Sequence, residues 1–339
     1  MADKPKYTKK DFMSDQRLRW CPGCGDYSIL SQVQTVLSEL ERPKHEFAII
    51  SGIGCSSRFP YYMNTYGFHT IHGRAPAFAT GLKIANPNLS VWQITGDGDG
   101  LSIGGNHLLH VLRRNVDLQI LLFNNRIYGL TKGQYSPTSE VNKVTKSTPM
   151  GSIDHPVEPC TFALGCDASF VARTIDIDVK KQREVLKEAY YHKGTSFVEI
   201  FQNCNIFNDG AFADVSSPKT RGAHVVYCKN GEHLTFGPKR GPQSGIRLTS
   251  KLTLEIVPLS ESPTDEELKE NNILVHDETN QILATLLSKM KHPVAMGVIY
   301  RVKRPIYEEQ LHKQVEVAQT KKTPDLMKTL YSGNTWVVE

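Results

Sequence analysis

"SVWQITGDGDGLSIGGNHLLHVLRRNVDLQILLFNN", residues 90–125, holds the two strands and one helix from which we predict the fold. Residues 90–96 and 118–123 are short apolar runs, as is typical of strands that are buried on both faces of a sheet. Between them, residues 104–115 place apolar side chains at helical spacing. A strand, a helix and a second strand in this order predict a parallel βαβ unit.

The same alternation continues on both sides of this stretch. Helical patterns occupy residues 27–40, 74–87 and 180–194, and further strand patterns occupy 47–54, 169–175 and 196–202. The predicted fold class is therefore α/β, with a doubly wound parallel sheet. Past residue 205 the pattern changes to short strands and turns, followed by a helix at 277–291. We divide the chain into an N-terminal segment 1–20, a binding domain 21–210 and a C-terminal region 211–339.

Composition narrows the class of protein. The 339 residues are 39% hydrophobic and 22% charged, with a net charge of +5 that no compact basic block concentrates, so we expect no nucleic acid partner. No apolar run is long enough for a membrane span, and the polar N-terminus lacks the apolar core of a secretory signal. We expect a cytoplasmic protein. Seven irregularly spaced cysteines favour metal or redox use of some thiols over a disulfide framework.

Polar residues follow two strands of the predicted sheet. Asp97 lies in a glycine-flanked turn after the strand 90–96, where backbone N–H groups can face a phosphate. Asn125 follows the next strand, and neighbouring strand ends in a parallel sheet lie about 5 Å apart. The Asn125 side-chain oxygen and the carbonyl of Ile127 can therefore complete a Mg²⁺ site begun by Asp97, with Gly129 leaving room for a diphosphate.

Each of these pieces alone is also a common turn, because Asp-Gly and Asn-Asn pairs are frequent at strand ends. Their pairing across one helix and one strand is what favours a binding site. A dinucleotide-binding site would require G-x-G-x-x-G after the first strand, and a P-loop would require G-K-[ST]; neither is present.

Four cysteines lie before the first helix or after strands of the same pattern. Cys21 and Cys24 form one C-x₂-C pair, Cys55 follows the strand pattern 47–54, and Cys204 follows the pattern 196–202. Four thiolates suit either structural zinc or a [4Fe–4S] cluster, and a C-x₂-C pair alone also suits a redox dithiol. We expect the remaining thiols to be buried as small apolar side chains; they are Cys160, Cys166 and Cys228.

The spacing from G-D-G to N-N resembles the thiamine diphosphate (TPP) motif. With "WCPGCGD", "GIGCSS", "HGRA" and "NNRIYGLTKGQYSPTS", the chain from about residue 15 to 210 resembles the β subunit of 2-oxoacid:ferredoxin oxidoreductases. The resemblance implies a sheet of the TPP-binding type with Mg²⁺ and one [4Fe–4S] cluster. It implies the CoA-dependent oxidative decarboxylation of a 2-oxoacid, or the reverse carboxylation, with electrons passing through the cluster to ferredoxin.

The resemblance also assigns roles to residues. It makes Cys21, Cys24, Cys55 and Cys204 the cluster ligands, and Asp97, Asn125 and Ile127 the Mg²⁺ ligands. It places His72 beside the cofactor, as a group that can share hydrogen bonds with the reacting atoms. The residues implied to line the cofactor are Ile53, Gly54, Cys55, Ser56, His72, Gly73, Gly98, Asp99, Gly129 and Leu130.

Substrate choice depends on the loop "TKGQ". Lys132 in this loop can pair with a second carboxylate of the substrate, although a solvent-exposed lysine is the ordinary expectation. Family members with this loop often use 2-oxoglutarate, which we prefer, with pyruvate and branched substrates left open.

The family's glutamate that activates TPP comes from the α subunit, so we expect this chain to be inactive alone. Two alternatives remain: a non-oxidative TPP-dependent decarboxylase or synthase with structural zinc, and a zinc-stabilised scaffold without catalytic activity.

Overall fold

The computed structural model describes residues 5–321 and 324–338. Residues 1–4 of the predicted N-terminal segment, and residues 322, 323 and 339 of the predicted C-terminal region, lie outside the described residues.

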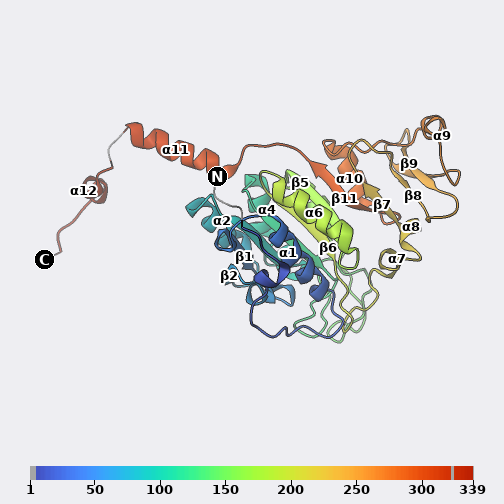
Figure 1. The fold of residues 1–339 in the computed structure, drawn as a ribbon. Helices are drawn as coiled ribbons and strands as arrows, with labels where there is room; N and C mark the ends of the chain where they lie inside the picture. The colour runs from blue at the N-terminus through green and yellow to red at the C-terminus, as the bar shows by residue number, and fades with distance from the viewer. Residues whose placement is uncertain (1–4, 322–323, 339) are drawn as a thin grey trace.

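The central sheet has eight strands among the described residues, in the order β2–β1–β3–β4–β6–β5–β11–β7 (Figure 1). Neighbours from β2 to β5 run parallel, whereas β11 runs antiparallel to β5 and parallel to β7. The strands are β1 (Phe47–Ser51), β2 (Tyr66–His69), β3 (Ser90–Gly96), β4 (Gln119–Asn124), β5 (Phe170–Ile175), β6 (Ser196–Phe201), β7 (Val225–Cys228) and β11 (Val294–Arg301). The predicted α/β class is confirmed, and the predicted parallel sheet is parallel from β2 to β5, with β11 antiparallel to β5.

Helices cover both faces of this sheet. Ala48 and Ile50 of β1 belong to a core with α2, α4, α5 and α10, whereas Phe47 and Ile49 belong to a second core with α1 and α6. This division follows from the alternation of side chains along a strand. The covering helices are α1 (Asp26–Glu39), α2 (Ala75–Ala85), α4 (Gly105–Arg114), α5 (Pro159–Gly165), α6 (Val179–Tyr191) and α10 (Gln281–Lys289).

Short helices occupy the connections. The 3₁₀ helices are η1 (Lys9–Phe12), η2 (Lys44–Glu46) and η3 (Ser56–Tyr62). The short α-helices are α3 (Asp97–Leu101), α7 (Ala213–Ser216), α8 (Arg221–His224) and α9 (Asp265–Glu270).

Three strands of the sheet were not among the sequence predictions as sheet members: β2, β7 and β11. All four residues of β2 are exposed, and Gly67 and His69 alternate with its two aromatic residues, so this short edge strand lacks the continuous apolar run of a buried strand. β7 and β11 come from the C-terminal region and extend the main sheet beyond β5. A separate antiparallel sheet is formed by β8 (Thr235–Phe236), β9 (Ser244–Leu248) and β10 (Leu254–Pro258).

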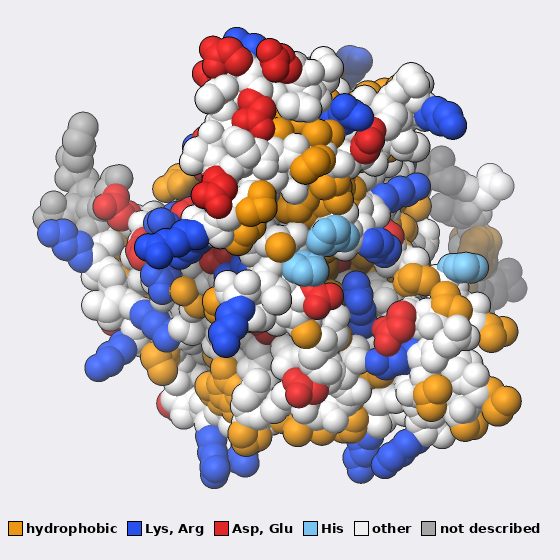
Figure 2. All heavy atoms as spheres, turned by 90° about the vertical axis from the view of Figure 1, so that its right-hand side faces the viewer, with side chains coloured by type: hydrophobic (Ala, Val, Ile, Leu, Met, Phe, Trp, Pro, Cys, Tyr) orange, Lys and Arg blue, Asp and Glu red, His pale blue; other side chains and the backbone are white. Residues whose placement is uncertain are grey.

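One end of the molecule is formed by part of the C-terminal region, the sheet β8–β10 and helix α9 (Figure 1). Figure 2 shows this end, where acidic and basic side chains are interspersed and hydrophobic side chains gather near the centre of the view. Its surface charge is therefore mixed rather than grouped by sign. None of the helices in residues 5–321 and 324–338 is long and apolar enough to cross a bilayer.

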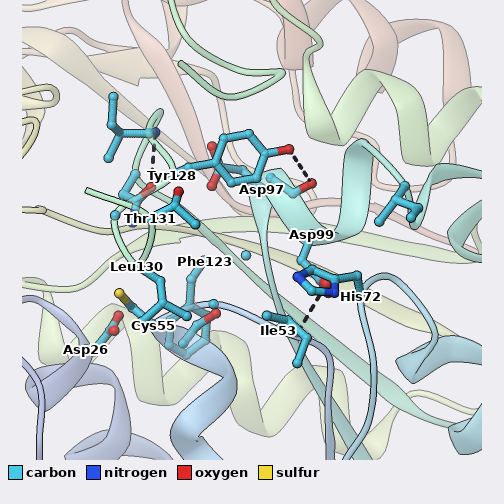
Figure 3. Close-up of a pocket in the computed structure, with 18 residues that line it drawn as sticks. Asp26, Ile53, Cys55, His72, Asp97, Asp99, Phe123, Tyr128, Leu130 and Thr131 are labelled. Carbon is cyan, nitrogen blue, oxygen red and sulfur yellow. Dashed lines mark hydrogen bonds between the residues drawn. The ribbon is translucent and has the colours of Figure 1, made fainter. Parts of the chain in front are cut away.

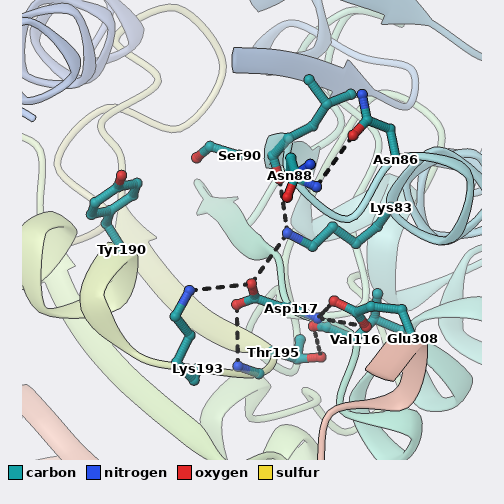
Figure 4. Close-up of polar contacts among 12 residues, drawn as sticks. Lys83, Asn86, Asn88, Ser90, Val116, Asp117, Tyr190, Lys193, Thr195 and Glu308 are labelled. Atoms are coloured by element: carbon teal, nitrogen blue, oxygen red, sulfur yellow. Dashed lines mark hydrogen bonds and ion pairs between the residues drawn. The ribbon is translucent and has the colours of Figure 1, made fainter. Parts of the chain in front are cut away.

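The last two helices, α11 (Tyr307–Lys321) and α12 (Leu326–Leu330), extend away from the rest of the chain (Figure 1). The root of α11 is held at the amino-terminal edge of the sheet, where the buried carboxylate of Glu308 accepts the backbone N–H of Asp117 at 3.2 Å. The Asp117 side chain pairs with Lys83 at 3.1 Å and lies 3.7 Å from the ammonium of Lys193 (Figure 4). This network lies at the opposite edge of the sheet from the turns that carry Asp97 and Asn125.

Candidate active site

Asp97 is the first residue of α3, directly after β3, and its side chain is 2% exposed. The hydroxyls of Ser136 and Thr138 each donate to its Oδ2 atom at 2.6 Å. Burial raises the pKa of Asp97, and the two hydroxyls oppose that shift. A carboxylate in this setting is fixed in direction and would be stabilised by a cation.

The loop after β4 brings Asn125 to the same edge of the sheet, because β3 and β4 pair directly and in parallel. The Asn125 amide donates to Gln202 Oε1 at 2.9 Å, and its oxygen accepts the backbone N–H of Ile127 at 3.1 Å. Asp97, Asn125 and Ile127 line one cavity of about 170 Å³ (Figure 3).

The same cavity collects most of the residues predicted to surround a cofactor. Ile53, Gly54, Cys55, Ser56, His72, Gly98, Asp99, Gly129 and Leu130 all line it. Gly73 does not line it and instead donates its backbone N–H to Asp99 Oδ1 at 2.8 Å. Its φ of +65° and the approach of Gly104, whose Cα atom would lie 2.4 Å from a Cβ added to Gly73, require glycine there.

Asp99 braces the loops around the cavity. Its Oδ1 atom accepts the backbone N–H groups of Ile53 at 3.1 Å and Gly73 at 2.8 Å, and its Oδ2 atom accepts the Thr95 hydroxyl at 2.8 Å. One carboxylate thus joins the turns after β1, β2 and β3.

Sequence reasoning missed Tyr128, which closes one side of the cavity. Its hydroxyl donates to the carbonyl of Gly98 at 3.1 Å, and its ring lies so close that a Cβ on Gly98 would approach Cε1 to 2.2 Å. The signal was present in "GDG" and "NNRIYGL", but only strand pairing shows that the tyrosine and the glycine meet.

The four cysteines singled out in the sequence line a second cavity, of about 200 Å³. They are Cys21, Cys24, Cys55 and Cys204. The two cavities share lining residues, among them Cys55, Asn125 and Gly129. A Cβ added to Gly129 would lie 3.6 Å from the sulfurs of both Cys55 and Cys204, so the loop after β4 lies directly against the two thiols.

Burial dominates the acid–base behaviour of two of these thiols, Cys24 and Cys55. It raises the pKa of Cys55 to about 12, and it raises the pKa of Cys24 further, with Asp26 adding to both shifts. A redox-active dithiol needs a lowered pKa, and the pKa of Cys24, one thiol of the C-x₂-C pair, is instead raised. Within residues 5–321 and 324–338, no three His, Cys, Asp or Glu side chains are close enough together to hold a single metal ion.

Asp26 is a second residue that the sequence did not single out. It is 1% exposed, lines both cavities, and its Oδ1 atom has no hydrogen-bond partner. Burial raises the pKa of Asp26 to about 7. The sequence feature that could have pointed to Asp26 is its position directly after "CPGCG".

Lys132 is exposed and lines the cysteine cavity rather than the first cavity. Its φ of +73° places it in a tight turn after Leu130. The other three cysteines line neither cavity; they are Cys160, Cys166 and Cys228.

The buried Asp97, the loop that begins with Asn125 and the glycine turns meet at the carboxyl ends of parallel strands, which is the arrangement expected of the TPP-binding domain that the motif resembles. Consistent with this, residues 52–200 match the family model described as "Thiamine pyrophosphate enzyme, C-terminal TPP binding domain".

Sequence identity to known proteins shows which family the chain belongs to. The chain is 49% identical to the 2-oxoglutarate oxidoreductase subunit KorB of Mycobacterium tuberculosis, over 100% of this chain and 90% of that one. It is 40% identical to the 2-oxoglutarate synthase subunit KorB of Methanocaldococcus jannaschii, over 57% of this chain and 72% of the relative.

A solved structure resembles the whole chain. It is a 2-oxoglutarate:ferredoxin oxidoreductase from Magnetococcus marinus with 2-oxoglutarate, coenzyme A and succinyl-CoA bound, with a TM-score of 0.77 and 32% identity over 98% of both chains. The chain belongs to the β subunits of the 2-oxoacid:ferredoxin oxidoreductases. The family predicted from the sequence is confirmed.

Proposed function

We propose that this chain is the β subunit of a 2-oxoglutarate:ferredoxin oxidoreductase, which forms succinyl-CoA from 2-oxoglutarate and CoA or catalyses the reverse carboxylation. The observation that carries the proposal is the shared wall between the two cavities, which includes Cys55, Asn125 and Gly129. A cofactor that releases electrons in the first cavity would lie beside an acceptor in the second. The similar KorB proteins and the M. marinus enzyme are named as 2-oxoglutarate oxidoreductases or synthases, which supports the proposal.

The first cavity fits TPP and Mg²⁺ by its donor set. Asp97, the Asn125 oxygen and the Ile127 carbonyl would hold the ion, because Mg²⁺ prefers oxygen ligands. TPP, when bound, supplies the carbon nucleophile and the electron sink for decarboxylation. Gly54, with φ at +122° and open space around it, leaves the backbone accessible to a phosphate. His72 lies on the cavity wall, where it would hold or share a proton with the substrate.

The second cavity fits a [4Fe–4S] cluster by its chemistry. Four thiols line one cavity from the segment before α1, the loop after β1 and the loop after β6, and a negative charge on Cys204 raises the pKa of both Cys24 and Cys55. Cluster binding requires deprotonated thiols, so the positive irons would offset the burial that now favours the neutral forms.

The active enzyme requires an α subunit, which would provide the TPP-activating glutamate, and a ferredoxin to take the electrons. We expect the β chain and α subunit, purified together without oxygen, to be brown and to contain iron. The complex should reduce viologen only when 2-oxoglutarate, CoA, TPP and Mg²⁺ are all present. Turnover by the purified β chain alone, or zinc in place of iron, would contradict the proposal.

Substrate choice gives a separate prediction for Lys132, whose ammonium is exposed beside the loop that carries Leu130. If it pairs with the second carboxylate of 2-oxoglutarate, Lys132→Ala should raise KM for 2-oxoglutarate about tenfold, as expected for a lost charged hydrogen bond. Pyruvate, which lacks that carboxylate, should be unaffected. Steady-state assays of the assembled complex with both acids measure this, and equal losses would exclude the role.

A further inference from the structure

A salt bridge is buried in the middle of the central sheet. Arg173 of β5 and Glu199 of β6 are directly paired residues of neighbouring strands, and their Nε and Oε2 atoms are 2.7 Å apart. The two side chains are 2% and 1% exposed. Removing two charges from water costs several kcal/mol per ion, and apolar replacements of such pairs are often neutral or stabilising. A contribution to folding stability therefore does not by itself explain why Arg173 and Glu199 are buried here.

Glu199 is connected to the end of the neighbouring strand β4. Its second oxygen, Oε1, accepts a hydrogen bond from the Asn124 side-chain amide at 2.7 Å. A carboxylate only accepts, so it fixes the Asn124 amide with its nitrogen toward Glu199 and its oxygen on the other side. The bond is charge-assisted and short, which makes this orientation strongly preferred.

The Asn124 oxygen meets both halves of the candidate Mg²⁺ site. It accepts the backbone N–H of Arg126 at 3.2 Å, which shapes the turn that leads through Asn125 to Ile127. It also lies 2.9 Å from the Thr138 hydroxyl, which in turn donates to Asp97 at 2.6 Å. The Asn124 amide thus contacts both the loop that carries the Asn125 and Ile127 oxygens and the Thr138 side chain, which donates to Asp97.

Arg173 fixes the opposite end of this chain of contacts. Its guanidinium donates to the backbone carbonyls of Ser288 at 3.2 Å and Ala295 at 3.4 Å, in α10 and β11. It also lies 5.4 Å from the ring centre of Phe201. The C-terminal region therefore supports the residue that orients Glu199.

We propose that Glu199, held by Arg173, is a positioning residue for Mg²⁺: it orients Asn124, which keeps the Asp97 and Asn125 loops in binding geometry. This inference rests on the proposed function, because it takes the Mg²⁺ site there as given. It also gives the C-terminal strand β11 and helix α10 a role in supporting the active site.

The test is a Mg²⁺ titration of the assembled α–β complex after chelation, with TPP binding followed by tryptophan fluorescence. Glu199→Gln keeps the side-chain size but removes the acceptor-only carboxylate. We expect its Mg²⁺ affinity to fall about tenfold, as for outer-shell partners of metal ligands. Higher Mg²⁺ should restore TPP binding. Cys160→Ala is the matched control, because the Cys160 thiol contacts the other Glu199 oxygen, at 3.1 Å, and it should leave Mg²⁺ affinity unchanged.

Glu199→Gln leaves Arg173 without a buried countercharge and can prevent folding. Arg173→Met/Glu199→Leu avoids that charge, and it should show the same loss of Mg²⁺ affinity because Asn124 again lacks its acceptor. Thr138→Val should couple with the Glu199 change, so that the combined loss is smaller than the product of the two single losses.

Unchanged Mg²⁺ affinity in a folded Glu199 variant, or a loss of TPP binding that Mg²⁺ does not restore, would overturn the inference. A wild-type complex without Mg²⁺-dependent TPP binding would instead contradict the proposed function itself.

Discussion

Asp97→Asn in the assembled complex is expected to abolish Mg²⁺-dependent TPP binding and, with it, the turnover of 2-oxoglutarate. Asparagine matches aspartate in size and can still accept the hydroxyls of Ser136 and Thr138, so the loop should keep its shape. Only the negative charge is lost, and Mg²⁺ depends on it. Because outer-shell changes already cost about 10–100-fold in metal affinity, we expect a loss larger than about 100-fold.

Mg²⁺ titration with TPP present measures this loss, and the thermal unfolding midpoint checks that the fold is kept. Asp265→Asn, an exposed acid in the first turn of α9, is the matched control and should behave as wild type. Wild-type Mg²⁺ affinity in Asp97→Asn would move the metal site away from this residue.

Cys204→Ala is expected to remove the iron–sulfur cluster while leaving TPP binding intact. Cys204 lines the cysteine cavity but not the first cavity, so its loss separates electron transfer from cofactor binding. Without a cluster the electrons have no path out of the site, and viologen reduction should fall to background.

Iron content, visible absorption and TPP affinity of the anaerobic complex together measure this effect. Cys166→Ala, a cysteine that lines neither cavity, should keep iron and activity. If the Cys204 variant keeps its iron, or if the wild-type protein holds zinc, the assignment of the four thiols is wrong.

Much of the fold follows from local patterns. The apolar runs at 47–51, 90–96 and 119–124 are strands because a strand buried on both faces needs no polar alternation. Their parallel pairing places the residues after them at one edge, which is why Asp97, Asn125 and Cys55 meet at one cavity. The exposed edge strand β2 has no such pattern and was missed.

The supporting residues of the site were not predictable in the same way. Ser136 and Thr138 lie in an irregular loop far from Asp97 in the sequence, and serine and threonine are ordinary residues there. Arg173 and Glu199 interrupt two apolar strands, but each alone reads as one polar residue in an otherwise apolar run.

By itself, the sequence determined the parallel α/β fold, the family, and the order in which the candidate ligands follow the strands. The spacing of apolar residues indicates which side chains are buried, and the spacing of the motifs indicates which turns lie at the same edge of the sheet. The tertiary structure alone decided which side chains meet: Asp26 between the cavities, Lys132 beside the cysteines, and the contacts from Arg173 to Asp97. Contacts of this kind depend on strand pairing and loop packing between segments that are distant in the sequence, so local sequence patterns do not predict them.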